Sequence, residues 1–131
     1  MIAIKNATLV MKDHLIPEAV LFVQDGLIAG FGEMRSTPIP EGCEIIDAHG
    51  AYVGPGLIDI HCHAGSGVRF ENGPETAAST HLPFGTTSML ATLGGRLTAQ
   101  ELVKGINGIR EAMTKPEGKN IAGIYMEGPY I

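Results

Sequence analysis

The stretch PGLIDIHCH at residues 55–63 decides how this chain can fold. Pro55-Gly56 interrupts regular structure, and the apolar run that follows is typical of a strand buried on both faces. Side chains on a strand alternate between its faces, so His61 and His63 point the same way and can present two imidazoles to one metal ion. Because α/β proteins build their sites at the carboxyl ends of strands, we predict that the two histidines lie in a functional site.

A histidine pair on a strand can also be exposed or hydrogen-bonded without binding metal, so this pattern alone leaves both interpretations open. The glycine-rich run at residues 64–67 favours the metal site, because it lets the backbone approach a ligand closely. Cys62 should face away from both histidines and pack as a small buried side chain rather than bind metal.

From residue 55 onward the chain alternates between strand and helix patterns. Strands are predicted at residues 57–60, 86–92 and 121–126, with a weak helix at 74–82 and a longer one between 98 and 115. Thr98 and Glu101 form a capping box that opens the longer helix. Its core stripe is predicted to consist of Leu102, Ile106, Ile109 and Met113.

Strands joined through helices pair in parallel, so their carboxyl ends meet at one edge of the sheet. This arrangement brings Glu127, at the end of the third strand, toward His61 and His63. A carboxylate with two imidazoles suits zinc or a similar divalent ion. The alternative for Glu127 is a surface or helix-capping carboxylate.

The first 54 residues read as short strands separated by turns. Asp25-Gly26 is a two-residue hairpin signal of the type I′ kind, so a small antiparallel unit is predicted. His14 and His49 are most simply exposed residues in turns. The predicted domains are therefore residues 1–54 and residues 55–131.

Composition narrows the classes of function. The chain has 131 residues, 44% of them hydrophobic, and a formal charge of -5, with no cluster of basic residues that would bind nucleic acid. Its apolar runs are too short to cross a bilayer and its start does not resemble a signal peptide, so we expect a soluble, cytoplasmic protein without a membrane partner. Cys43 and Cys62 are not expected to form a disulfide.

These motifs resemble the amidohydrolase superfamily, and within it the N-acetylglucosamine-6-phosphate deacetylase family. The segments that carry the resemblance are DGLI (25–28), DAHG (47–50), PGLIDIHCH (55–63), GVRFEN (67–72), GTT (85–87) and MEGPYI (126–131). PGLIDIHCH is shared across the superfamily. GVRFEN and MEGPYI point to the deacetylases, because other branches usually hold a carboxylated lysine where this chain has a glutamate.

The resemblance implies an α/β fold: a small β-sandwich plus the first three strands and helices of a (β/α)8 barrel. It implies one or two divalent ions, zinc first and iron, cobalt or manganese as alternatives, with Glu127, His61 and His63 as ligands. The implied reaction is metal-dependent deacetylation of N-acetylglucosamine 6-phosphate to glucosamine 6-phosphate and acetate. The alternative is an amidohydrolase acting on cyclic amides or amines.

The resemblance also implies that the chain is the amino-terminal portion of a longer enzyme, which would be a homodimer acting on an amino-sugar phosphate. The general-base aspartate is then expected beyond residue 131, and no catalytic base is assigned within the chain. The isolated chain is expected to be inactive. Another possibility is a non-catalytic piece that needs a partner to complete the barrel.

Overall fold

The computed structural model describes residues 1–128, and the chain divides into two compact units. The first unit comprises residues 1–55 and the second begins at Gly56. Residues 129–131, the end of the MEGPYI segment, lie outside the described part. No helix within residues 1–128 is long and apolar enough to cross a membrane.

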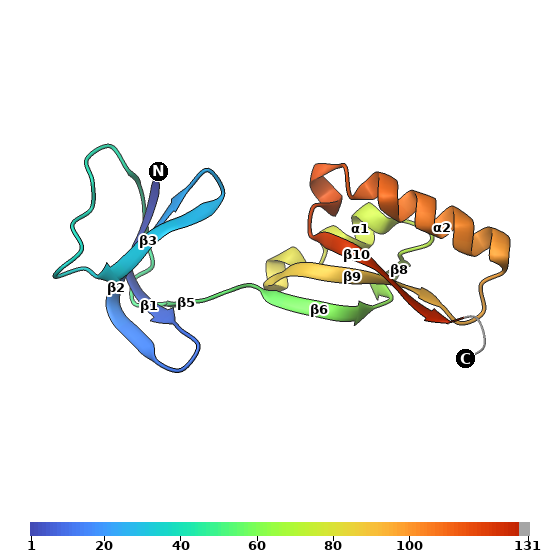
Figure 1. The fold of residues 1–131 in the computed structure, drawn as a ribbon, viewed down its shortest axis with the longest axis horizontal. Coiled ribbons are helices and arrows are strands. Elements are labelled where there is room, and N and C mark those ends of the chain that lie inside the picture. Colours follow the sequence, from blue (N-terminus) through green and yellow to red (C-terminus); the bar gives the residue numbers. More distant parts are fainter. Residues whose placement is uncertain (129–131) are drawn as a thin grey trace. The chain divides into compact units, whose positions relative to one another are not determined.

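The first unit is a five-stranded sheet (Figure 1). Its strands are β1 (Ile2–Val10), β2 (Leu15–Gln24), β3 (Leu27–Glu33), β4 (Glu44–Asp47) and β5 (Tyr52–Val53). β1, β2 and β3 pair antiparallel, but β4 and β5 both pair parallel with β1. The prediction of a purely antiparallel unit is therefore wrong. The reason is the loop after β3, which returns the chain to the start of β1, where the Glu44 N–H donates to the Met1 carbonyl at 3.0 Å.

The predicted hairpin turn at Asp25-Gly26 is confirmed. It joins β2 to β3, and φ is 51° at Asp25 and 77° at Gly26. A type I′ turn requires positive φ at both central residues, and its twist matches that of the flanking strands. A glycine at the second position satisfies this requirement without strain.

The second unit belongs to the α/β class, as predicted. Its main strands are β6 (Leu57–Cys62), β9 (Thr86–Gly94) and β10 (Ile121–Gly128), which pair in parallel in the order β10-β9-β6. The helices α1 (Pro74–Ser79) and α2 (Ala99–Ala112) lie along one face of this sheet (Figure 1). Smaller elements complete the unit: a hairpin of β7 (Ala64–Gly65) and β8 (Val68–Arg69), and the single turns η1 (Leu82–Phe84) and η2 (Pro116–Gly118).

The predicted capping box opens α2. The Glu101 N–H donates to the Thr98 hydroxyl at 3.3 Å, and the Thr98 N–H donates to the Glu101 carboxylate at 2.7 Å. Ile109 is fully buried in the core of this unit, and Leu102 and Ile106 pack against it. Met113 is 36% exposed, so its assignment to the core stripe is wrong. The helix ends at Ala112, one residue before it.

The first parallel strand, β6, differs from the prediction of a buried strand. Leu57, Ile58 and Ile60 are exposed by 63%, 73% and 68%. Strand order explains this, because β6 lies at the edge of the sheet and β9 is central. The core of the unit is built instead around β9, whose Met89 and Leu93 are fully buried.

Candidate metal centre

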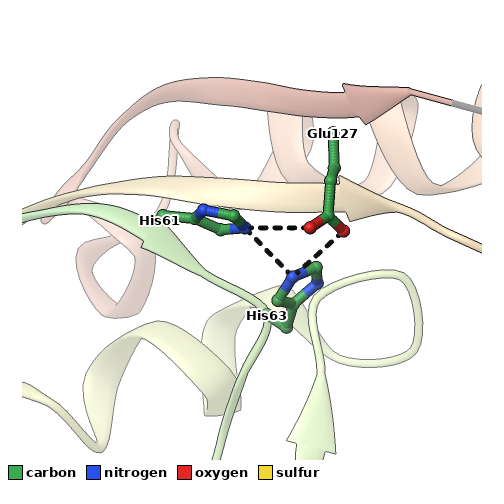
Figure 2. Close-up of side chains that lie close together, drawn as sticks. All are labelled: His61, His63 and Glu127. Atoms are coloured by element: carbon green, nitrogen blue, oxygen red, sulfur yellow. Dashed lines mark hydrogen bonds and ion pairs between the residues drawn. The ribbon is translucent and has the colours of Figure 1, made fainter. Parts of the chain in front are cut away.

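Three side chains converge at the carboxyl edge of the parallel sheet (Figure 2). The His61 and His63 Nε2 atoms lie 3.2 Å apart. Glu127 faces both rings, with Oε1 3.5 Å from His61 Nε2 and Oε2 3.4 Å from His63 Nε2. One ligand atom from each residue lies within 4.8 Å of the others. The structure thus brings together all three residues that the sequence predicts as metal ligands.

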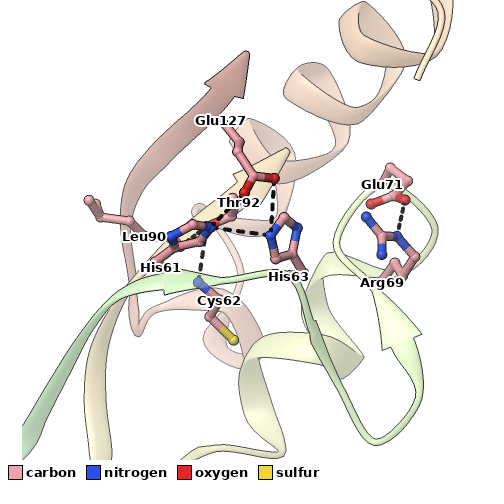
Figure 3. Close-up of polar contacts among 8 residues, drawn as sticks. All are labelled: His61, Cys62, His63, Arg69, Glu71, Leu90, Thr92 and Glu127. Carbon is pink, nitrogen blue, oxygen red and sulfur yellow. Dashed lines mark hydrogen bonds and ion pairs between the residues drawn. The ribbon is translucent and has the colours of Figure 1, made fainter. Parts of the chain in front are cut away.

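The parallel topology produces this convergence. His61 belongs to β6, His63 follows it directly, and Glu127 is in β10, on the far side of β9. The Cys62 N–H donates to the Thr92 hydroxyl of β9 at 3.0 Å, which fixes the backbone between the histidines (Figure 3). The Tyr125 ring lies 5.0 Å from the His61 ring, centre to centre, and supports its position.

The donor atoms of the three residues lie close enough together to be candidate ligands of a divalent ion. Ligand atoms bound at about 2.0–2.2 Å to a tetrahedral ion lie roughly 3.3–3.6 Å apart. The two Nε2 atoms lie 3.2 Å apart, and each faces a different oxygen of Glu127, at 3.5 and 3.4 Å, so that one donor atom from each residue lies within 4.8 Å of the others. Two imidazoles and a carboxylate form a donor set suited to zinc, and three ligands leave coordination positions open. The side chains are 45%, 34% and 27% exposed for His61, His63 and Glu127, so an ion could enter from solvent.

The prediction that Cys62 packs away from the histidines is confirmed. It is buried in the core of the second unit, with its sulfur 3.4 Å from the Ala64 carbonyl. Burial raises the pKa of its thiol and thereby disfavours the thiolate that would bind metal. Cys62 and Cys43 are both free, as predicted.

The other histidines have different partners. His14 and His49 are exposed and pair with neighbouring aspartates, at 2.6 Å from Asp13 and 3.4 Å from Asp47. His81 Nε2 lies 3.0 Å from the Ala64 carbonyl. Asp59 accepts the backbone N–H of His61 at 3.0 Å, so this carboxylate supports the strand that carries the histidines.

A pocket of about 530 Å³ opens beside the three ligands. Its lining consists of His63, Arg69, Glu71, Gly94, Gly95, Arg96, Leu97, Glu101 and Glu127. Sequence analysis included Arg69 and Glu71 only within the GVRFEN segment, and it missed Arg96 and Gly94-Gly95. The available signal was position, since residues 94–97 directly follow the central parallel strand, where such sites form.

Comparison with known proteins assigns a class to this fold and site. The chain belongs to the amidohydrolase superfamily. Among solved structures it resembles N-acetylglucosamine-6-phosphate deacetylase from Pasteurella multocida, with a TM-score of 0.84 and 27% identity over 99% of this chain and 35% of that one. No protein-family model matches the chain.

Two curated relatives carry other names. D-hydantoinase from Rhizobium radiobacter is 39% identical over 119 residues, which are 89% of this chain and 23% of the relative. Adenine deaminase from Kosmotoga olearia is 40% identical over 89 residues, which are 67% of this chain and 14% of the relative. The chain therefore spans less than a quarter of the length of either relative.

Proposed function

We propose that this chain supplies the first metal ligands of a hydrolase that cleaves N-acetylglucosamine 6-phosphate to glucosamine 6-phosphate and acetate. The observation that carries the proposal is the convergence of His61, His63 and Glu127 at the carboxyl edge of three parallel strands. Members of the superfamily use divalent metals, and zinc is the ion we favour, with iron, cobalt or manganese as alternatives. One or two ions are compatible with three ligands and open positions.

Within this site, a divalent ion would polarise the amide carbonyl and lower the pKa of a water molecule. His61 and His63 would hold the ion from one strand, and Glu127 would hold it from another. The pocket beside His63 would receive the substrate. Asp59 is engaged by the His61 backbone, so we assign it a supporting role, and the general-base aspartate is expected from a segment beyond residue 131. For the full-length enzyme we also propose a complete (β/α)8 barrel, a β-sandwich that includes the first unit, and a homodimer.

A linear amide is favoured over a cyclic one by two features. The deacetylase from Pasteurella multocida matches nearly the whole chain in structure, and a glutamate stands at position 127 where a carboxylated lysine is typical of other branches. The names of the curated relatives keep cyclic-amide hydrolysis and deamination as the second candidate.

Metal titration of the purified chain tests the site itself. We expect Zn²⁺ or Co²⁺ to bind weakly in isothermal titration, and His61→Ala, His63→Ala or Glu127→Gln to abolish the binding. His14→Ala and His49→Ala are matched controls, because both residues are exposed histidines of the first unit, whereas the three ligands belong to the second. Equal losses from all the histidine variants would refute the assignment.

Activity is tested in a chimera that joins this chain to the remaining part of the Pasteurella multocida deacetylase. Metal-dependent acetate release from N-acetylglucosamine 6-phosphate, lost in Glu127→Gln, would support the proposal. Turnover of a hydantoin or of adenine, without acetate release, would support the second candidate. The chain alone is expected to show no turnover, because it lacks an assigned base and general acid–base assistance contributes about 10²–10⁴ in rate.

A non-catalytic role is favoured by one separate observation. Ile58 and Ile60 of the edge strand β6 are largely exposed, and an open strand edge with apolar side chains readily pairs with another chain. In this alternative the chain is an assembly piece that needs a partner to complete the barrel. A compact monomer at all concentrations in sedimentation would count against it.

A further inference from the structure

Two buried polar atoms beside the candidate metal centre lack hydrogen-bond partners within residues 1–128. They are Nδ1 of His63 and Oε2 of Glu71. Both residues line the same pocket. Figure 3 shows the His63 ring with Glu127 on one side and the Arg69–Glu71 pair on the other. One atom can donate a hydrogen bond and the other can only accept one, so their needs are complementary.

Metal binding would determine the role of His63 Nδ1. The His63 Nε2 atom faces His61 and Glu127, so it is the nitrogen that would bind the ion. The proton of the neutral imidazole must then reside on Nδ1, which becomes a hydrogen-bond donor. Histidines that bind metal almost always donate this second N–H to a carboxylate, a carbonyl or a water.

Glu71 is held in place as an acceptor. Its Oε1 accepts a hydrogen bond from Arg69 Nε at 2.5 Å, while the side chain is only 9% exposed. Its Cβ packs against α2 at Gly105, where an added Cβ would lie 3.3 Å away. The carboxylate is thus held in place through Oε1, and Oε2 remains available to accept a hydrogen bond.

We propose that Glu71 is a positioning residue of the metal centre. Its Oε2 accepts the Nδ1–H of His63, directly or through one water molecule, when the ion is bound. This contact would select the tautomer of His63, orient its ring and increase the electron density that Nε2 offers to the metal. The inference rests on the proposed metal site and adds a residue that does not touch the ion.

A purely structural role for Glu71 predicts different behaviour. If Glu71 served only to hold Arg69 and the β7–β8 hairpin, its replacement would alter stability without a specific effect on His63. The test therefore needs a signal from the His63 ring itself, in addition to metal affinity.

The experiment uses Co²⁺ binding to the whole chain. Glu71→Gln retains the volume of the side chain but removes its charge. Glu75→Gln on α1 is the matched control, because the Glu75 carboxylate pairs with Lys115 and does not line the pocket. We expect Glu71→Gln to weaken Co²⁺ affinity about 10–100-fold, as is typical when such a partner is lost.

Paramagnetic NMR of the Co²⁺-loaded chain supplies the second signal. The exchangeable Nδ1–H of His63 should exchange with solvent faster in Glu71→Gln than in the unmodified chain, while that of His61 should not change. If the chain binds no Co²⁺ at all, the proposed metal site fails and the inference fails with it. If Co²⁺ binds normally and Glu71→Gln changes neither affinity nor the His63 signal, the inference alone is overturned.

Discussion

Gly94 lies directly against Glu127: a Cβ atom added at Gly94 would come within 2.6 Å of the Glu127 Cβ. Gly94 ends β9 and Glu127 lies in the neighbouring strand β10, so the absence of a side chain at one position leaves room for the carboxylate at the other. The candidate metal centre therefore depends on a residue that has no side chain with which to bind metal.

Substitution of Gly94 should weaken metal binding. In Gly94→Ala the new methyl group cannot fit without displacing Glu127, so we expect Zn²⁺ affinity to fall by about tenfold or more, as for other changes behind a ligand. Gly108→Ala is the control, since nothing lies within 4 Å of a Cβ at Gly108. Isothermal titration checks both variants, and unchanged affinity in Gly94→Ala would contradict the dependence of the site on Gly94.

The two glycines of α2 should respond differently to alanine. Gly108→Ala should stabilise the fold by about 0.4–1 kcal/mol, because alanine favours the helix and restricts the unfolded chain. At Gly105 an added Cβ would lie 3.2 Å from Leu93 and 3.3 Å from Glu71, so crowding should offset that gain. Urea unfolding should rank Gly108→Ala as the more stable variant, and the reverse order would contradict this packing.

The capping box of α2 should be measurable by mutation. Thr98→Ala removes the hydroxyl that accepts the Glu101 N–H, and we expect a loss of about 1 kcal/mol in the free energy of unfolding. Thr76→Ala, at an exposed position within α1, is the comparison because its hydroxyl does not cap a helix. Equal unfolding midpoints for the two variants would argue against the cap.

Lys115 links two acidic side chains, and this link should make stability depend on pH. Its Nζ lies 2.9 Å from Glu75 and 2.7 Å from Glu111. The hydrogen bond from Lys115 holds the pKa of Glu75 below its ordinary value, and the bonds to Glu111 and Glu75 raise the pKa of Lys115. Both shifts indicate that the charged forms are favoured in the folded state.

The direction of the pH effect follows from these shifts. A lowered carboxyl pKa stabilises the fold above the ordinary glutamate value of about 4.3, and the contribution is lost as the pH falls through the lower folded value. The stabilisation linked to the raised pKa of Lys115 is fully present at every pH below the ordinary lysine value, so this contribution to stability is constant in the acidic range. Glu75→Gln should therefore be less stable than the unmodified chain at pH 7, and the difference in urea midpoint should shrink in acid. A difference that persists at pH 2 would require another explanation.

The residues that could be predicted from sequence are those governed by short-range rules. The period of a strand places His61 and His63 together, and parallel pairing brings Glu127 to the same edge. The capping box at Thr98 and the turn at Asp25 also follow from local chemistry. Each of these features depends on a few neighbouring residues or on one rule of topology.

The features that were predicted wrongly or missed depend on strand order and on contacts distant in sequence. An apolar strand reads as buried, but β6 is exposed because it lies at the edge of its sheet. The parallel pairing of β4 with β1 depends on the course of a loop that carries no pairing signal. The close approach of Gly94 to Glu127 requires the register of β9 and β10, which no local pattern defines.

The exposed edge of β6 leads to a prediction about self-association. Ile58 and Ile60 are exposed by 73% and 68%, and β6 has β9 on one side only within the described sheet. We expect sedimentation to show association that increases with concentration. Ile60→Lys should reduce it, because a charged side chain on an edge strand opposes pairing with a second strand. The free energy of unfolding of Ile60→Lys should change by no more than about 0.5 kcal/mol, since the side chain is already mostly exposed.

Val103→Lys is the control: it places the same charge on α2 at a position 59% exposed, and it should leave association unchanged. Association that is equally reduced in both variants would point to net charge rather than to the strand edge as its cause.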